Sequence, residues 1–420
     1  MRKSHRTSGT ILSKKAFAGL LLIPFCLSLG SCDSMRIKKI VSKPYYSLTE
    51  EGLGTPVKEQ LEGVCWVMAA STSMESNYLV RYGKEISIDP YSLLYDVFDE
   101  EHEEGYFPIV PEIMGDIGGD YTMVTGAATN GFINTDADGN ETFWVVTDAT
   151  TYIDPTTEEI KEALATNGAI AIDTVDKDSD FGTFDGFKTL NDPTSDLLDH
   201  AVCIVGWDDN FPKENYRIPA QENGAWIAQN SHSELFGNDG FYRIAYESHI
   251  EAYTSFSISD EYTAVDSLTE GIGSTIEIEG CDVNGITCAN YYEGNGTISA
   301  VGTYLVNPGM KVEVEIFEGL FGKSLAKTDA EFEYAGYHTI ELPKDIEVNG
   351  YTVVITYYGP APVEGPAWHE GAMHYDISID EGQSFVYIDN EPRDLFFADT
   401  YNALGWEEST GNLYINVLYK

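Results

Sequence analysis

The stretch Glu59–Ser71, written EQLEGVCWVMAAS, places a glutamine five residues before a cysteine and a tryptophan directly after it. Beyond Cys65, apolar side chains recur at four-residue steps from Trp66 to Tyr78. This spacing predicts a helix with one buried stripe, and Gly83 predicts its end. Cys65 therefore lies at the start of a predicted helix.

A cysteine at a helix start has two interpretations. Cysteine is often a small apolar side chain that is simply buried. At a helix N-terminus, however, the positive end of the helix dipole favours the thiolate, which is the attacking form. A working nucleophile would also need an imidazole to exchange protons, a group to orient that ring, and donors for the oxyanion.

Each of these roles has a candidate in the chain. His200 opens the apolar strand-like run HAVCIVGW, 135 residues after Cys65. Asn230 closes GAWIAQN, and its carboxamide could accept a hydrogen bond from the ring of His200. Gln60 could place its side-chain amide beside the backbone N–H of Cys65 as an oxyanion hole. A lone histidine or cysteine is usually structural, so it is the ordered set of four that indicates a catalytic site.

These residues lie in longer blocks that resemble a known family. EQLEGVCW, HAVCIVGW and WIAQNSHSELFGNDGFYRI look like the three catalytic blocks of papain-like cysteine peptidases, in the same order, within a similarity that covers roughly residues 53–250. The resemblance implies an α+β, two-lobed peptidase domain with Cys65 as nucleophile, His200 as acid and base, Asn230 as the orienting group and Gln60 as oxyanion donor. It implies no cofactor, and no metal is required.

The same resemblance indicates where a substrate would lie. IGGDYTMVTGAA is similar to the segment in which a glycine pair lets an extended substrate run alongside, which places Gly118 and Gly119 on the cleft rim, although two adjacent glycines are more often a turn. Trp66 and Ala201, the neighbours of Cys65 and His200, are also expected to contact the substrate. IKEALATNGAIAIDT resembles the helix and strand that precede the histidine.

The sequence departs from the family pattern at several positions. Leu61 follows Gln60 where the family usually has Gly, and Gly63-Val64 precede the cysteine where Gly-Ser is usual. After the orienting Asn, His232 stands where a tryptophan usually covers the Asn–His hydrogen bond. We expect a polar cover to weaken that bond and shift the pKa of His200. The 23 residues from Asp33 to Thr55 are too few for a long inhibitory helical pro-segment.

The C-terminal part consists almost entirely of strand patterns separated by Gly, Pro, Asn or Asp. The runs are GTISAVGTYLV, MKVEVEIFE, YHTIELP, YTVVITYYG, QSFVYI and LYINVLYK. They predict an all-β sandwich over residues 265–420, which resembles the lectin-like domain of some exported clostridial peptidases. Trp368 and Trp406 could stack on sugars, but single aromatics on a sandwich more often serve packing.

The N-terminus has the layout of an export signal. Five basic residues precede the apolar run AFAGLLLIPFCL and a small-residue stretch, and the apolar run is too short for a permanent membrane helix. Leu29-Gly30-Ser31-Cys32 resembles a lipobox, so we expect residues 1–31 to be removed and Cys32 to be lipidated; an ordinary cleaved signal is the alternative. Residues 32–54 are expected to be a tether, and residues 55–260 the peptidase domain.

The acidic composition excludes some classes of binding partner. A formal net charge of −45 argues against nucleic acid or anionic lipid surfaces, which bind clustered basic residues. Cys203 lies in an apolar strand pattern and is expected to be buried, whereas Cys281 and Cys288 could close a small loop.

The leading hypothesis is a secreted cysteine endopeptidase, lipid-anchored to the outer face of the bacterial cytoplasmic membrane, that cleaves peptide or protein substrates. Carbohydrate or cell-wall ligands are candidates for the C-terminal domain. One alternative is a catalytically silent peptide-binding or adhesion protein on the same scaffold, and another is a peptidoglycan hydrolase with a Cys–His pair.

Overall fold

The computed structural model describes most of the chain. The described residues are 34–60, 63–97, 121–135, 140–176, 181–194, 198–269, 274–277, 280–364, 379–405 and 411–420. The chain divides into two compact units, residues 1–43 and 44–420. In the first unit, residues 34–41 form a helix. The second unit contains the other described helices and the described strands, and Cys32 lies outside the described residues.

The central strand of the N-terminal domain is β7 (His200–Asp208), whose residues are buried at every position except the last. Strand β8 (Ala225–Gln229) pairs with one edge of β7, and β4 (Ile170–Thr174) and β1 (Tyr45–Ser47) pair with the other edge, all antiparallel. A strand buried on both faces explains the continuous apolar run after His200. Because β1 belongs to this sheet, the prediction of a tether over residues 32–54 is wrong for its strand residues.

The remaining strands of this domain extend the sheet. Strands β8 and β9 pair antiparallel, β9 pairs parallel with β6, and β5 forms a hairpin with β6. A long strand, β3, pairs with β10 and with the short β2. The bounds are β2 Phe132–Thr135, β3 Glu141–Ile153, β5 Phe181–Phe184, β6 Phe187–Leu190, β9 Phe241–Ala245 and β10 Ala252–Ser259.

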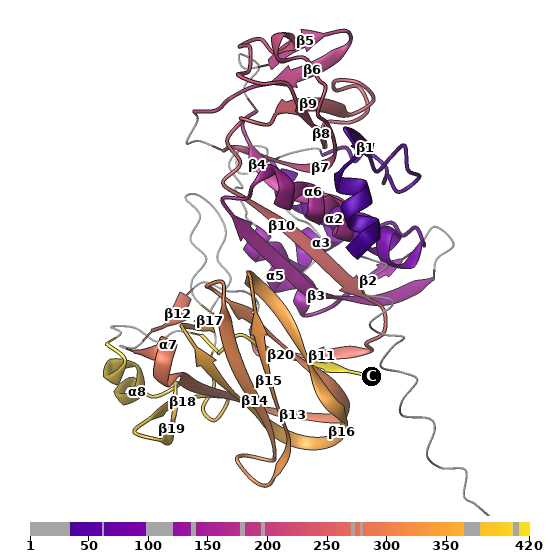
Figure 1. Ribbon diagram of the computed structural model, residues 1–420. Helices are drawn as coiled ribbons and strands as arrows, with labels where there is room; N and C mark the ends of the chain where they lie inside the picture. The colour runs from indigo at the N-terminus through magenta and orange to yellow at the C-terminus, as the bar shows by residue number, and fades with distance from the viewer. Residues whose placement is uncertain are drawn as a thin grey trace, which may run out of the picture. The chain divides into compact units, whose positions relative to one another are not determined.

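Helix α2 (Cys65–Tyr82) begins at the cysteine and ends at Gly83, whose left-handed backbone (φ 64°) closes the helix, as predicted. Its side chains are buried without interruption from Trp66 to Leu79, so the prediction of a single buried stripe is wrong. The helix is enclosed because β7 and β10 lie along it (Figure 1) and other helices pack on its remaining sides. These helices are α3 (Pro90–Val97), α5 (Tyr121–Thr129) and α6 (Thr157–Asn167).

A capping box fixes the start of helix α6, which precedes β4 in the chain. Thr156 caps its first turn, and the Glu159 side chain accepts a hydrogen bond from the Thr156 backbone N–H, which completes a capping box.

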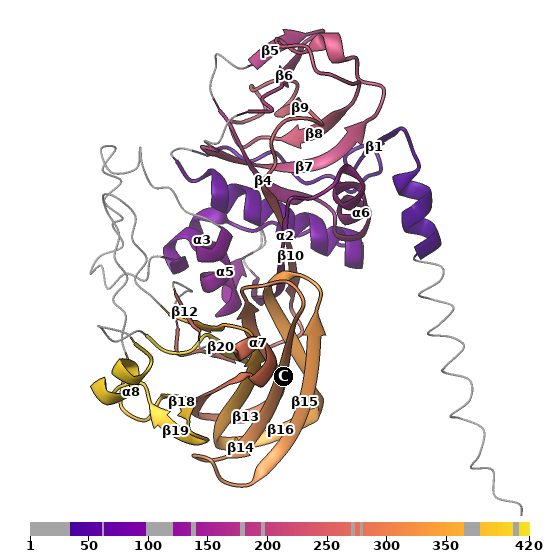
Figure 2. The ribbon, with the colours of Figure 1, turned by 60° about the vertical axis from the view of Figure 1, so that its left-hand side comes forward.

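A short 3₁₀ helix, η1 (Lys213–Asn215), lies between β7 and β8. Figure 2 shows α2, α3 and α5 gathered together in purple, with β7, β8 and β9 in rose forming the other half of this domain.

The C-terminal part is the expected all-β sandwich (Figure 2). Strand β13 (Ile286–Leu305) pairs with β16 (Ala335–Tyr358) over most of its length, and β14 (Met310–Glu318) lies between β16 and β15 (Ser324–Phe332). Alternate residues of β14 are buried, which is the period-two pattern read from MKVEVEIFE. Their apolar side chains face those of β13 and β16 in one core.

The other elements of the sandwich are short. They are β11 (Ala264–Asp266), β12 (Ser274–Ile276), α7 (Cys281–Asn284), β17 (Ala361–Val363), β18 (Ser384–Ile388), β19 (Glu391–Asp394), α8 (Ala398–Ala403) and β20 (Ile415–Tyr419). Cys281 and Cys288 are both buried and free, and Cys203 is buried in β7 as expected. Trp368 and Trp406 lie outside the described residues. No described helix has the length and apolar character needed to cross a membrane.

The sandwich is hydrogen-bonded to the N-terminal domain. Residues 335–338 of β16 pair antiparallel with residues 148–151 of β3. His338 is buried at this junction, with Nδ1 2.9 Å from a carboxylate oxygen of Asp148. The Tyr262 hydroxyl donates to Glu341 at 2.9 Å. Strand pairing and buried polar contacts therefore join the two parts of this unit.

Gly206 in β7 provides a test of how the sheet is held together. A Cβ at this position would lie 2.2 Å from the backbone oxygen of Tyr46 in β1. Gly206→Ala should force β1 away from β7 and lower the free energy of unfolding by about 1–3 kcal/mol, as overpacking does. Urea unfolding followed by the fluorescence of the adjacent Trp207 would measure it.

Gly83→Ala is the matched control, because no atom lies within 4 Å of its added Cβ and only the left-handed backbone resists the substitution. We expect a loss of about 1 kcal/mol there. Unchanged stability of Gly206→Ala would show that β1 is not tightly fitted to β7.

Candidate active site

A short segment before α2 is fixed against the turn after β8. The Gln60 N–H donates to the Ser231 carbonyl at 2.8 Å, and the Ser233 N–H donates to the Lys58 carbonyl at 3.3 Å. The Lys58 ammonium lies 2.7 Å from Glu75 of α2, and both side chains are largely buried. Because a buried charge needs its partner, this ion pair ties the segment that carries Gln60 to the helix that carries Cys65.

Cys65 is the first residue of α2 and is partly buried. Burial raises the pKa of its thiol, while hydrogen bonds from backbone N–H groups, first that of Ala201 and then that of Trp66, act to lower it. The helix start therefore favours the thiolate as expected, but desolvation outweighs it and the net shift is upward. The backbone of Ala201, the residue that follows His200, thus acts on the Cys65 thiol.

His200 and Asn230 meet as the sequence predicted. The Nε2 of His200 lies 2.8 Å from the Oδ1 of Asn230, and both side chains are buried. That oxygen also accepts the Ser231 backbone N–H at 2.7 Å, which fixes the direction of the carboxamide. His200 must then carry its proton on Nε2, which leaves Nδ1 as its unprotonated nitrogen. Burial lowers the pKa of His200, and Asp176 and Asn230 partly offset this.

Gln60 is held at its oxygen. The Ser231 hydroxyl donates to Gln60 Oε1 at 2.5 Å, so this end of the carboxamide is occupied by a hydrogen bond. The Nε2 of Gln60 carries two N–H groups and no acceptor. Hydrogen bonds thus join His200 to Asn230, and Ser231 joins Asn230 to Gln60. The four predicted residues remain a prediction as a complete site.

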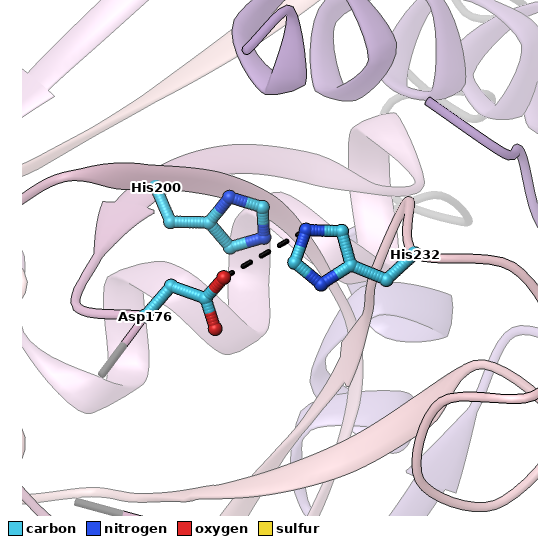
Figure 3. A group of neighbouring side chains, drawn as sticks. All are labelled: Asp176, His200 and His232. Atoms are coloured by element: carbon cyan, nitrogen blue, oxygen red, sulfur yellow. Dashed lines mark ion pairs between the residues drawn. The ribbon is translucent and has the colours of Figure 1, made fainter. Parts of the chain in front are cut away.

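The cover of this site is polar. The His232 ring stacks on the His200 ring with centroids 4.7 Å apart and planes 28° apart. Its Nδ1 lies 3.4 Å from Asn230 Nδ2, and its Nε2 lies 3.7 Å from a carboxylate oxygen of Asp176 (Figure 3). Sequence reasoning missed Asp176, which follows β4 within an acidic stretch and had no motif to mark it.

Asp176, His200 and His232 are the group of described residues whose donor atoms, all within 4.8 Å of one another, could hold a metal ion. Zinc requires bonds of about 2 Å from lone pairs that converge on one point. Stacked imidazole rings keep their lone pairs in nearly parallel planes, so they do not converge. This arrangement suits hydrogen bonding better than metal binding.

Other predicted site residues have different outcomes. Trp66 is 2% exposed, so its indole is part of the core and not a surface that touches substrate, and that prediction is wrong. Ala201 is also buried and contributes its backbone N–H. Gly118, Gly119 and Leu61 lie outside the described residues.

A pocket of about 160 Å³ lies beside Asp173 of β4. Its lining includes Tyr121, Asp173 and Thr254, together with Tyr304 from the sandwich. Asp173 of β4 pairs in register with Ala201 of β7, and its carboxylate raises the pKa of Cys65 as a minor effect after burial. The sequence did not single out Asp173, because only the pairing of β4 with β7 brings it next to the site.

Known proteins share both parts of the chain. The papain family cysteine protease profile matches residues 47–263, and a lectin-like domain profile matches residues 269–404. A cysteine proteinase of Trypanosoma brucei brucei is 30% identical over 206 residues, covering 46% of this chain and 42% of the relative. Procathepsin L of Rattus norvegicus is 27% identical over 206 residues, covering 47% of this chain and 58% of the relative. The chain thus spans about half the length of these curated relatives.

Two structures of Cwp84 share the whole arrangement. The clostridial cysteine protease Cwp84, as a cysteine-to-alanine variant after propeptide cleavage, superposes with a TM-score of 0.70 at 19% identity, covering 89% of this chain and 98% of Cwp84. A crystal structure of the cysteine protease and lectin-like domains of Cwp84, a surface layer associated protein of Clostridium difficile, gives a TM-score of 0.68 at 18% identity, covering 90% of this chain and 88% of that one. The fold is therefore a papain-like domain followed by a lectin-like sandwich. Because the family profile spans just over half of the 420 residues, the chain belongs to the papain family of cysteine proteases.

Proposed function

We propose that the chain is an exported, surface-anchored cysteine endopeptidase that hydrolyses peptide bonds at a Cys65–His200–Asn230 site. The observation that carries this proposal is the orientation of His200. Asn230 holds its Nε2 at 2.8 Å, and the backbone of Ala201, the next residue, acts to lower the pKa of the Cys65 thiol. This supports a site in which the base, with its orienting group, serves Cys65 as nucleophile.

In the proposed reaction the sulfur of Cys65 attacks the carbonyl carbon of the scissile peptide. Nδ1 of His200 accepts the thiol proton and delivers it to the leaving amine, so that the C–N bond breaks and a thioester remains. A water molecule, deprotonated by the same nitrogen, then attacks the thioester, and the thiol regains its proton as the acid product leaves. Asn230 keeps the ring aligned throughout.

The negative oxygen that forms on the carbonyl needs donors. The first N–H groups of α2 have no acceptor inside the helix, and that of Cys65 faces the reacting carbonyl. Gln60 supplies the second donor through Nε2, because its Oε1 is already engaged by Ser231. The Lys58–Glu75 ion pair and the hydrogen bond to the Ser231 carbonyl hold the Gln60 segment in place.

The resting pair is neutral in this proposal. Burial raises the pKa of Cys65 and lowers that of His200, and both shifts favour thiol and imidazole over an ion pair. Proton transfer therefore accompanies attack on the substrate. A catalytically silent peptide-binding protein is the alternative, motivated by His232 in place of an apolar cover. The intact Asn230–His200 hydrogen bond favours the enzyme.

The location of the enzyme is also proposed. The basic and apolar segments before Cys32 support export and lipidation, which would hold the protein at the outer face of the cytoplasmic membrane. The sandwich would then bind carbohydrate or cell-wall ligands near the same surface, which the lectin-like likeness supports.

Replacing the nucleophile tests the activity. Cys65→Ala should abolish thiol-dependent cleavage of casein, since no other group in the proposed site can form the thioester. Hydrolysis and labelling by an epoxysuccinyl thiol-protease inhibitor would be measured together. Cys281→Ala, which removes a buried thiol of the sandwich, should keep both. A folded wild-type protein that neither cleaves nor is labelled would eliminate the peptidase.

Asp173 should set a preference for substrates with a positive side chain near the scissile bond. Asp173 lines a pocket, is exposed and acts on the pKa of Cys65, so the gain for Arg or Lys over Leu should be about threefold, as for other exposed ion pairs. Asp173→Asn should remove this ratio in kcat/KM across a peptide library. Asp185→Asn, on the β5–β6 turn, should leave the ratio unchanged. Equal ratios in wild type and Asp173→Asn would assign specificity elsewhere.

If Cys32 is lipidated, replacing it should change how the protein partitions between detergent and water. In full-length protein expressed in a bacterial host, Cys32→Ala should move the chain from the membrane and detergent phase to the aqueous phase. Phase separation with Triton X-114, followed by immunoblotting, would measure this. Identical partitioning of the two proteins would instead support an ordinary cleaved signal.

A further inference from the structure

His232 takes no part in the proposed chemistry, yet it contacts both His200 and the residue that orients it. Its ring stacks on His200, and its Nδ1 lies 3.4 Å from the Nδ2 of Asn230. About a third of the His232 side chain is exposed, at 32%, so it exchanges protons with solvent. A partly exposed imidazole shields a buried hydrogen bond poorly, which indicates a role other than that of an apolar cover.

The hydrogen bonds around Asn230 determine the proton positions on both rings. The carboxamide oxygen accepts from the Ser231 N–H and from His200, so the amide nitrogen must be the atom that faces His232. That nitrogen carries only donors, and so Nδ1 of His232 must be an unprotonated acceptor. The proton of neutral His232 then lies on Nε2, the nitrogen that faces Asp176 at 3.7 Å (Figure 3).

We propose that His232 is a positioning residue, in which the neutral ring holds the carboxamide of Asn230 in the orientation that fixes His200, and protonation releases it. Asp176 assists by selecting the required tautomer. The inference rests on the proposed function. We therefore expect His200 to lose its alignment at acid pH because His232 becomes protonated.

Protonation of His232 changes three contacts at once. Nδ1–H would face the amide N–H groups of Asn230, which replaces a hydrogen bond with two opposed donors. The imidazolium would be drawn toward the carboxylate of Asp176 and away from Asn230. Its charge would also oppose the imidazolium of His200, which must form to protonate the leaving amine, at a ring separation of 4.7 Å.

Several carboxylates lie around the two histidines. Asp176 faces it from the end of β4, and Asp199, just before β7, acts on the neighbouring His200. Glu59 forms a backbone bridge with His232 itself. Among the described residues, Lys188 of β6 contributes a positive charge in this region. Its Nζ lies 4.1 Å from the Phe236 ring centroid, and the Phe236 ring contacts the His232 ring with centroids 5.5 Å apart.

Two substitutions of His232 distinguish the role of its acceptor nitrogen from that of its stacking surface. His232→Phe keeps the stacking surface and removes the acceptor, whereas His232→Asn places an oxygen near the Nδ1 position and cannot titrate. In the full-length protein we expect His232→Phe to lower kcat about tenfold with little change in KM, which is the effect of one lost hydrogen bond. His232→Asn should keep most of the activity and move the acid limb of the kcat profile to lower pH.

Two further variants complete the comparison. Asp176→Asn should also move the acid limb to lower pH, because the protonated form of His232 loses its partner. Removal of the Asp176 carboxylate also lowers the pKa of His200, the base of the neutral pair, and so moves the acid limb in the same direction. His249→Asn removes an exposed histidine elsewhere and should leave the profile unchanged.

A measurement that does not depend on catalytic turnover tests the positioning role separately from the peptidase activity. In the full-length protein with nitrogen-15 in its histidines, the ring nitrogen shifts should show His232 protonated on Nε2 alone at alkaline pH, and His200 should change when His232 is charged. Such shifts in a protein without activity would support the positioning role and remove the enzyme. Active wild type whose kcat and pH profile match those of His232→Phe would overturn the positioning role.

Discussion

The hydrogen bond from the Ser231 backbone N–H to the Asn230 carboxamide oxygen, 2.7 Å long, is the contact on which the rest of the site depends. A carboxamide has an acceptor end and a donor end, and a backbone donor cannot be reversed. With the oxygen fixed, Asn230 must accept from His200 and donate to His232. One main-chain group thereby sets the proton positions on two imidazoles.

The scaffold supplies this geometry through close main-chain packing. Gly206 allows β1 to approach β7 to a distance that no side chain would permit, so the strand that begins at His200 is enclosed on both edges. The buried Lys58–Glu75 pair connects the Gln60 segment to α2. Buried ion pairs contribute little net stability, but removing one partner is costly, so such a pair serves position more than stability.

Local patterns explain what the sequence predicted correctly, and contacts between distant segments explain the rest. The apolar run after Cys65 and Gly83 beyond it define α2, and the alternating residues of MKVEVEIFE define β14. Strand β15, SLAKTDAEF, was missed because its pattern is polar, and β1 was assigned to a tether because only its pairing with β7 reveals it. Likewise, YHTIELP and YTVVITYYG proved to be one strand, β16, because pairing with β13 carries it through the polar residues between them. Asp176 and Asp173 could be recognised as neighbours of the site only from the pairing of β4 with β7.

The proton affinity of His200 combines these long-range effects. Burial is the largest influence and lowers its pKa, as it must for a ring that is 6% exposed. The carboxylates of Asp176 and Asp199 act in the opposite direction, and the neighbouring His232 lowers the pKa further. A ring that was only buried would not accept the thiol proton, and a ring surrounded only by carboxylates would not release it to the leaving amine. The acidic groups near β4 and β7 therefore restore, at this one ring, part of the basicity that the close packing of the site removes.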